Sequence, residues 1–279
     1  MNKTLNIACL LAAAALVSSC GGNKPKENSD YPDWAWADFQ RPEGVNPIIS
    51  PDASSIFYCP MRQDSVRWEE SDTFNPAATV KDGKVVVLYR AEDNSAVGIG
   101  TRTSRIGYAS SDDGLHFTRL DAPVFYPADD SQRELEHPGG CEDPRVAMTE
   151  DGLYVMLYTQ WNRKQARLAV ATSRDLLQWE KHGPAFARAY DGRFRDDFSK
   201  SASIVTKLVD GRQVIAKIDG KYYMYWGEKF VNVATSDDLI NWTPMLDETG
   251  GLLKVMTTRE GKFDSDPTER GPPAGMTDR

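Results

Sequence analysis

One segment of this chain occurs three times at nearly constant spacing. Residues 106–117, 168–179 and 231–242 each combine an alternating strand pattern, a Ser/Asp turn and a closing aromatic residue. Their shared alanines, Ala109, Ala171 and Ala234, are 62 and 63 residues apart. A fixed period of this length is typical of architectures built from repeated copies of one supersecondary unit.

Two further elements precede each copy. One is a strand with a tyrosine or tryptophan near its end, in residues 85–90, 154–159 and 222–226. The other is an inner element that begins with polar residues and turns small or apolar, starting at Asn75, Glu142, Lys200 and Glu269. Together with strands expected at 105–110, 167–172 and 231–235, this pattern predicts an all-β fold and a β-propeller. A β-sandwich is the alternative, although a sandwich does not repeat one motif at constant spacing.

In a propeller the innermost strands line a central channel, so their polar starts should meet at one mouth. We therefore expect Asn75, the group Glu142, Asp143 and Arg145, and Lys200 to share one cavity with Glu269. Pro144 favours an extended conformation at the preceding residue, which would deliver the acid onto the start of a buried strand. Taken alone, the same residues also fit an ordinary Asp-Pro turn with a surface ion pair.

The propeller pattern is incomplete within these residues. From about residue 46 to residue 279 there are three full units and the first strand of a fourth. Five blades of about 60 to 70 residues each need roughly another hundred residues. We therefore expect a truncated propeller domain over 46–279, with about three and a half blades.

The first twenty residues are typical of an export signal rather than of a folded element. Lys3 precedes an apolar run that is too short for a stable membrane span and that ends in small residues before Cys20. Residues 1–20 resemble a bacterial lipoprotein signal in which Cys20 is lipidated; an ordinary secretory signal is the alternative. Residues 21–45 suit a tether and lead-in. We expect a cell-envelope lipoprotein, periplasmic or anchored in the outer membrane, that contacts the membrane only through its lipid.

Charge and cysteine content exclude several kinds of partner. With 33 basic and 41 acidic residues the net charge is −8, without a basic stripe, so nucleic acid is not an expected partner. His116, His137 and His182 lie far apart and form no Cys/His cluster, so neither a metal nor another cofactor is expected. Beyond the signal, Cys59 and Cys141 either pair in an oxidising compartment or fill buried sites. The oligomeric state is open.

Carboxylates, a few cations and many aromatic residues without metal ligands suit glycoside chemistry. One carboxylic acid protonates the leaving oxygen while a second carboxylate activates water from the opposite face. The candidates are Asp143, Glu228 and Glu269, with Glu142 and Asp93 in reserve. Glu228 with Lys229, and Glu269 with Arg270, also fit ordinary surface ion pairs.

A set of five motifs resembles glycoside hydrolase family 130. The motifs are RAED at 90–93, SRIGYA at 104–109, GCEDPR at 140–145, SKS at 199–201 and ERGPPA at 269–274. They occur in order from about residue 46 to the end of the chain. The resemblance implies a five-bladed β-propeller enzyme that acts on β-mannosides, by hydrolysis in some members and by phosphorolysis in others.

The resemblance also implies roles for individual residues. Asp143 is implied as the general acid, acting through the 3-hydroxyl of the mannosyl unit. Glu228 and Glu269 match the glutamates of hydrolytic members that cleave β-1,2-linked mannosides; a carboxylate there repels phosphate and accepts a proton from water. Residues that match positions contacting the substrate or orienting the acid are Asn75, Arg90, Asp93, Arg105, Arg145 and Lys200.

The sequence thus predicts an inverting, exo-acting β-mannosidase for β-1,2-linked mannosides. A phosphorylase of β-1,4-mannosyl-glucose or mannosides, releasing mannose 1-phosphate, is the first alternative, because Arg163, Lys164, Arg167 and Lys200 lie near the expected site. A secreted enzyme lacks a dependable pool of phosphorylated intermediates, so the export signal favours hydrolysis. An inactive or glycan-binding remnant is the second alternative.

Overall fold

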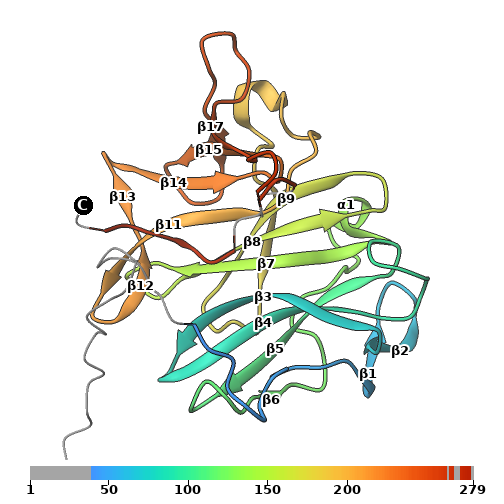
Figure 1. Cartoon of the computed structure of the whole chain (residues 1–279). Coiled ribbons are helices and arrows are strands. Elements are labelled where there is room, and N and C mark those ends of the chain that lie inside the picture. The colour runs from blue at the N-terminus through green and yellow to red at the C-terminus, as the bar shows by residue number, and fades with distance from the viewer. Residues whose placement is uncertain (1–38, 263, 267–270, 278–279) are drawn as a thin grey trace, which may run out of the picture. The chain divides into compact units, whose positions relative to one another are not determined.

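A computed structural model describes residues 39–262, 264–266 and 271–277 (Figure 1). All of the elements below belong to the unit Arg41–Arg279. The regular elements of its described residues are strands, apart from one short helix, α1 (Arg133–Glu136), and one 3₁₀ turn, η1 (Ala189–Gly192). The all-β prediction is confirmed. Within the described ranges, no helix has the length and apolar character needed to cross a membrane.

Three four-stranded antiparallel units follow one another along the chain (Figure 1). The first contains β3 (Asp72–Lys81), β4 (Lys84–Glu92), β5 (Ser104–Ser111) and β6 (Thr118–Arg119). The second contains β7 (Gly140–Met148), β8 (Tyr154–Trp161), β9 (Ala166–Ser173) and β10 (Glu180–Pro184). The third contains β11 (Ala202–Val209), β14 (Lys221–Trp226), β15 (Phe230–Ser236) and β16 (Trp242–Pro244). Each of the six strands predicted from the repeat lies inside one of these strands.

The remaining strands extend or flank these units. β1 (Asp52–Cys59) and β2 (Asp64–Glu69) form a separate antiparallel hairpin before the first unit. β12 (Arg212–Ile215) pairs with β11 and joins β7 in parallel, and β13 (Lys217–Ile218) pairs with β14. β17 (Lys254–Thr257) pairs with β15, and β18 (Ala274–Gly275) pairs in parallel with β11. The hairpin lies outside the repeat and was not predicted.

The hydrophobic core consists of three clusters, each between neighbouring units. Tyr89 packs in the cluster that joins the hairpin to the first unit. Leu88 and Met156 pack between the first and second units, and Leu157 with Trp226 between the second and third. Leu88 and Tyr89 face different clusters because successive strand residues point to opposite faces of a sheet. The first and second sheets therefore pack against hydrophobic clusters on both of their faces.

The two described cysteines are buried and free. Cys141 belongs to the cluster between the first and second units, whereas Cys59 belongs to the cluster beneath the hairpin. Of the two alternatives left open by the sequence, the structure therefore supports buried fillers and not a disulfide.

The Ser/Asp turn has the same hydrogen bonds in all three units. The hydroxyls of Ser111, Ser173 and Ser236 each accept the backbone N–H three residues on, at 2.8–2.9 Å. The aspartate two residues after each serine accepts two further backbone N–H groups. Such local side-chain bonds are the reason Ser and Asp favour turns. The sequence repeat is therefore a structural repeat.

The inner strands share an unusual backbone where their polar side chains begin. β3 and β7 each shift register there, as in a β-bulge. Asn75 in β3, Asp143 in β7 and Ser201 just before β11 have φ values of 44°, 50° and 49°, so the extended conformation expected at Asp143 before Pro144 was wrong. Asn and Asp tolerate this left-handed region better than most residues. Equivalent positions of the three units thus present polar side chains from the same backbone geometry.

Candidate active site

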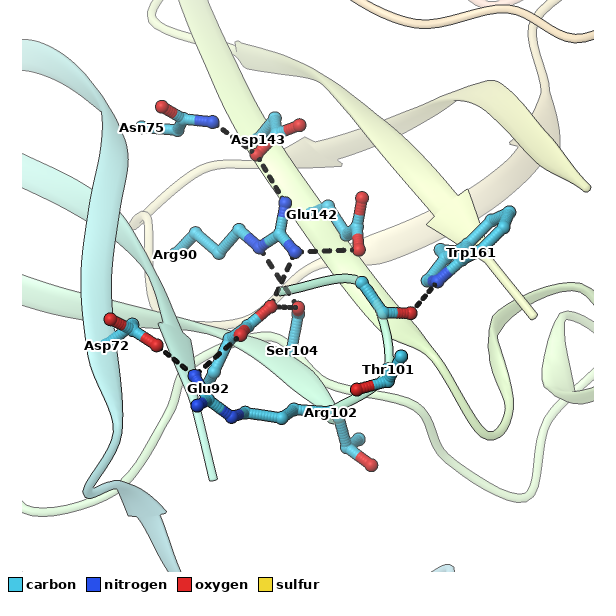
Figure 2. Close-up of polar contacts among 12 residues, drawn as sticks. Asp72, Asn75, Arg90, Glu92, Thr101, Arg102, Ser104, Glu142, Asp143 and Trp161 are labelled. Atoms are coloured by element: carbon cyan, nitrogen blue, oxygen red, sulfur yellow. Dashed lines mark hydrogen bonds and ion pairs between the residues drawn. The ribbon is translucent and has the colours of Figure 1, made fainter. Parts of the chain in front are cut away.

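The carboxylate of Asp143 contacts residues of all three units, and Figure 2 shows its contacts with the first. Its Oδ1 accepts hydrogen bonds from Asn75 Nδ2 at 2.9 Å and from Arg90 Nη1 at 3.0 Å. Its Oδ2 lies 3.3 Å from Lys200 Nζ, and the side chain is only 3% exposed. The structure therefore brings together Asn75, Asp143 and Lys200, which the repeat predicted to meet, and adds Arg90, which the family resemblance implied.

Arg90 is surrounded by three carboxylates. Its Nη2 lies 2.9 Å from Glu142 Oε1 and 2.6 Å from Glu92 Oε1, while Nη1 contacts Asp143. Its Nε donates to Ser104 Oγ at 3.0 Å, and Ser104 in turn donates to Glu92 at 3.0 Å (Figure 2). A guanidinium offers its donors in a rigid planar fork, so these contacts fix the orientation that it presents to the two adjacent acids of β7.

Glu92 and Ser104 lie inside the recognised motifs, but sequence reasoning gave them no role. The register of β4 and β5 pairs them directly, which places both on the face that carries Arg90. From the loop between these strands, Arg102 forms ion pairs with Asp72 and, at 3.5 Å, with Glu92. The sequence signal that could have identified Glu92 is its spacing of two from Arg90 at the end of a strand, which puts both ionisable side chains on one face.

The pKa values of the two adjacent acids are displaced in opposite directions. Burial raises the pKa of Glu142, and the charges of Arg90 and Lys200 offset only part of this effect. Burial also acts to raise the pKa of Asp143, but Arg90, Lys200 and hydrogen bonds outweigh it and leave the pKa below its usual value. Two neighbouring carboxyl groups whose pKa values are pushed apart are typical of acid–base sites.

Lys200 is the central cation of the site. Its Nζ lies 3.3 Å from both Glu142 Oε2 and Asp143 Oδ2. Burial lowers the pKa of Lys200, but the charges of Asp143, Glu142 and Glu228 raise it overall. Glu228 follows Gly227, whose N–H donates to the Lys200 carbonyl at 3.1 Å, so the backbone holds this third carboxylate near the lysine.

Arg105 lies on the opposite face of β4 and β5 from Arg90, where it meets Asp93, the residue that follows β4. Asp93 Oδ2 is 2.9 Å from Arg105 Nη1, and both side chains are 1% exposed. Arg105 Nη2 contacts Cys59 Sγ at 3.4 Å, on the side of the hairpin. These two predicted substrate contacts pair with each other and not with the Asp143 cluster.

The other candidate residues are dispersed. Arg145 lines a cavity of about 400 Å³ together with Asn75. Arg167, one of the cations that suggested phosphate binding, pairs with Asp196 at 2.8 Å. Glu269 lies outside the described residues. Among the described ranges, no group of three or more His, Cys, Asp or Glu side chains is arranged to hold a metal ion.

Comparison with known proteins identifies the family of this constellation. The model of glycoside hydrolase family 130, described as beta-1,4-mannooligosaccharide phosphorylase, matches residues 46–269. A solved structure from Bacteroides thetaiotaomicron, provisionally described as a glycosidase, is 83% identical, with 90% of this chain and 72% of that chain covered and a TM-score of 0.88. Another solved structure is 63% identical, with 89% of this chain and 69% of that chain covered and a TM-score of 0.88. It is described with the statement that this family of mannoside phosphorylases contains glycoside hydrolases that target β-1,2 mannosidic linkages in Candida mannan.

Curated relatives are more distant. A 1,2-beta-oligomannan phosphorylase of a Thermoanaerobacter species is 35% identical over 179 residues, which cover 63% of this chain and 53% of the relative. A beta-1,2-mannobiose phosphorylase of the same organism is 30% identical over 160 residues, which cover 53% of this chain and 47% of the relative. This chain thus spans about half the length of the curated relatives it matches. With the family model covering most of its length, the chain belongs to glycoside hydrolase family 130.

Proposed function

We propose that the protein is an inverting, exo-acting β-mannosidase that hydrolyses β-1,2-linked mannosides. The observation that carries this proposal is the environment of Lys200, which lies 3.3 Å from two carboxylates and within the field of Glu228. A phosphate dianion at this lysine would meet three nearby carboxylates, and like charges repel strongly in a buried site. Water has no such penalty. The 63% identical structure described with hydrolases for β-1,2 linkages supports the same reaction and linkage.

In this reaction water attacks the anomeric carbon from the face opposite the leaving oxygen. The carbon–oxygen bond to the leaving sugar breaks as the new bond forms, which inverts the configuration. Asp143 supplies the proton to the leaving oxygen through the 3-hydroxyl of the mannosyl unit. Glu228, together with Glu269, takes the proton from the attacking water.

Protonation of Asp143 accompanies substrate binding in this proposal. Burial favours the protonated acid, whereas Arg90 and Lys200 hold the pKa of Asp143 low in the absence of sugar. A neutral sugar ring that covers the acid and moves the lysine aside removes part of that positive field, so the pKa rises. Glu142, whose pKa is raised, is the neighbouring group that most readily exchanges a proton with Asp143.

We further propose that the three four-stranded units of the domain at 46–279 are blades of a β-propeller of the five-bladed kind. Their equivalent left-handed inner residues and the contacts at Asp143 support a common axis beside β3, β7 and β11. An experimental structure in which these inner strands do not surround one axis would contradict this architecture.

Residues 1–38 lie outside the described residues, so the export signal and Cys20 remain proposals from sequence. We propose that lipid on Cys20 anchors the protein in the cell envelope, on the periplasmic side or in the outer membrane. Cys20→Ala should then move from the membrane fraction to the soluble fraction. Unchanged fractionation would contradict the anchor.

One observation favours the phosphorylase alternative. Arg167 Nη1 is buried without a hydrogen-bond partner among the described residues, although Nε of the same side chain pairs with Asp196. A phosphate oxygen would satisfy this donor, and both curated relatives are phosphorylases. In that case the product would be mannose 1-phosphate.

Assay on β-1,2-mannobiose with and without inorganic phosphate separates the two reactions. We expect mannose at the same rate in both mixtures, with the α-anomer appearing first by NMR because the reaction inverts. Mannose 1-phosphate as the main product would overturn the proposal in favour of phosphorolysis. Binding of the disaccharide without turnover would favour a glycan-binding role.

Glu228→Gln tests the electrostatic argument directly. It removes one negative charge near Lys200, so hydrolysis should slow and phosphate, without effect on the parent, should begin to inhibit. Glu248→Gln, at an exposed glutamate in a surface turn, is the matched control and should change neither property.

A further inference from the structure

A second cavity, of about 420 Å³, has no role in the proposed reaction. It lies between the turn after β1, the loop that joins β4 and β5, and the residues that precede β7. Its lining includes Arg62, Arg105, Arg163 and His137, with the hydroxyl groups of Ser95 and Thr103. None of the relatives' descriptions assigns a ligand to such a site.

Every charged side chain in the lining is an arginine. Arg62, Arg105 and Arg163 contribute three positive charges, and no aspartate or glutamate lines the cavity. Arg62 and Arg163 are exposed at its edge and have no ion pair with any described residue. In a chain of net charge −8, this local excess of positive charge is a distinct feature.

The nearest buried acid does not neutralise these two arginines. Asp93 Oδ2 lies 2.9 Å from Arg105, and Oδ1 accepts the backbone N–H groups of Ser95 at 3.0 Å and Thr103 at 3.3 Å. Burial acts to raise the pKa of Asp93, but Arg105 and the Ser95 hydrogen bonds lower it overall. The Asp93 carboxylate is therefore ionised, and both of its oxygens are occupied by the contacts just described. The charges of Arg62 and Arg163 are left uncompensated.

His137 lies in the same positive field. Burial lowers the pKa of His137, and the charges of Arg133 and Arg163 lower it further, against a smaller opposite effect of Glu134. Its Nδ1 is shielded from solvent and has no hydrogen-bond partner among the described residues. The cavity therefore offers a polar atom without a partner beside unpaired arginines.

We propose that this cavity binds an oxyanion group, a phosphate or a carboxylate, carried by a sugar-sized ligand. The planar guanidinium matches both groups with two parallel hydrogen bonds. The volume falls in the range of about 300–1,000 Å³ that is usual for small-molecule sites. Arg105, held by Asp93, forms a rigid wall, while Arg62 and Arg163 are free to close on the anion from the edge.

The cavity shares a wall with the candidate active site. Thr103 Oγ1 donates to the Pro138 carbonyl at 2.9 Å, and the next residue, Ser104, donates its N–H to the Gly139 carbonyl at 2.8 Å. On the other side of this wall the Ser104 hydroxyl contacts Arg90. That the oxyanion belongs to an acidic mannoside rests on the proposed function; oxyanion binding itself does not.

Calorimetric titration of the purified protein with four probes tests the site. The probes are mannose 6-phosphate, mannuronic acid, inorganic phosphate and mannose. We expect at least one acidic sugar to bind 10-fold or more tightly than mannose, and the double variant Arg62→Gln, Arg163→Gln to lose that preference. Equal binding of inorganic phosphate would identify a free ion as the ligand. Arg212→Gln, at an exposed arginine in β12, is the matched control and should retain the preference.

Two results would overturn the proposal: no preference for any anionic probe over mannose, or a preference that survives in the double variant. Both arginines are exposed, so the variants should keep the melting temperature of the parent, which is to be measured alongside. Calorimetry does not depend on turnover. Oxyanion binding by a protein that leaves β-1,2-mannobiose intact would uphold the cavity and contradict the proposed hydrolysis, and the reverse result would do the opposite.

Discussion

Two acid–arginine clusters are built from neighbouring residues of β4 and β5, yet their composition differs. Arg90 contacts three carboxylates, two of which also contact Lys200. Arg105 contacts one carboxylate, that of Asp93. The first cluster carries one negative charge more than its cations balance, so a proton can be held there. In the second cluster the charges of Asp93 and Arg105 balance, and the pair has a structural role. Proton transfer is therefore expected of the first cluster alone.

Strand alternation produces this difference. Leu88 packs towards the second unit, on the face that carries Arg90, whereas Tyr89 and Ala91 pack towards the hairpin. Arg105 is the cross-strand partner of Ala91 and shares its face. Residues adjacent in one motif therefore serve two different interfaces, which the motif alone does not reveal.

The largest expected difference between the clusters is in turnover. Asp143→Asn should lower kcat on β-1,2-mannobiose by roughly 10²–10⁴-fold, the usual contribution of a general acid. Asp93→Asn should lower kcat far less per folded molecule. Steady-state kinetics of both variants measures this contrast, and full activity in Asp143→Asn would refute its role as the acid.

The next difference is in stability. Asp93→Asn leaves Arg105 buried without its partner, which usually costs about 3–5 kcal/mol in free energy of unfolding. Asp151→Asn removes an ion pair with Arg174 in which both side chains are more than half exposed, and should destabilise the protein far less because solvent screens the pair. Urea unfolding of the two variants makes the comparison. Equal losses in free energy of unfolding would show that the Asp93–Arg105 pair stabilises the fold no more than a surface ion pair does.

A smaller effect is expected from Glu92→Gln, which we consider a positioning residue for Arg90. Without the negative charge of Glu92, Arg90 stabilises the ionised forms of Glu142 and Asp143 more strongly, so the pKa of each of these two acids falls. A catalytic acid that must be protonated then loses its proton at a lower pH. The basic limb of the kcat/KM profile should therefore shift to lower pH. The accompanying loss of kcat should be roughly 10-fold, since coupled buried groups interact by about 0.5–3 kcal/mol.

Glu69→Gln is the control for that shift. Glu69 is also fully buried, but it contacts Tyr89 at 2.8 Å and Arg119 at 3.2 Å beneath the hairpin. Its substitution should lower the melting temperature without moving the pH profile. If both variants shift the profile equally, the effect of Glu92 is not specific to the Arg90 cluster.

The smallest effect concerns the pH dependence of the second cluster. The pKa of Asp93 is lowered in the folded protein, so its stabilising contribution is complete above the unfolded value, about 3.9. It is lost as the pH falls through the folded pKa, because the unfolded chain then binds the proton first. The stability gap between parent and Asp93→Asn should therefore narrow below about pH 4. Unfolding titrations that show a widening gap would contradict this assignment.

The repeat period made much of the fold and part of the site predictable. A strand pattern that recurs every 62 or 63 residues constrains where each strand lies, and it placed Asn75, Asp143 and Lys200 at equivalent starts of inner elements. Their contacts follow from that equivalence. The β1–β2 hairpin stands before the first repeat, so no period pointed to it.

The rest depends on pairing between residues that the sequence does not bring into register. Because a loop of unknown conformation joins β4 and β5, the sequence does not show that Glu92 pairs with Ser104 or that Arg105 faces away from Arg90. Only the hydrogen-bonded register of the two strands decides these faces. The opposite pKa displacements of Glu142 and Asp143 likewise arise from burial and from Lys200, a residue of another unit.

The left-handed backbone at Asn75, Asp143 and Ser201 has a consequence for the evolution of such sites. Few side chains accept this geometry, and β-branched residues are nearly excluded from it. At this position of each unit only a few residue types are therefore tolerated, mainly small polar residues and glycine. New specificities in this scaffold must arise mainly at the neighbours of these positions, such as Glu142 and Lys200, where the backbone imposes no such restriction.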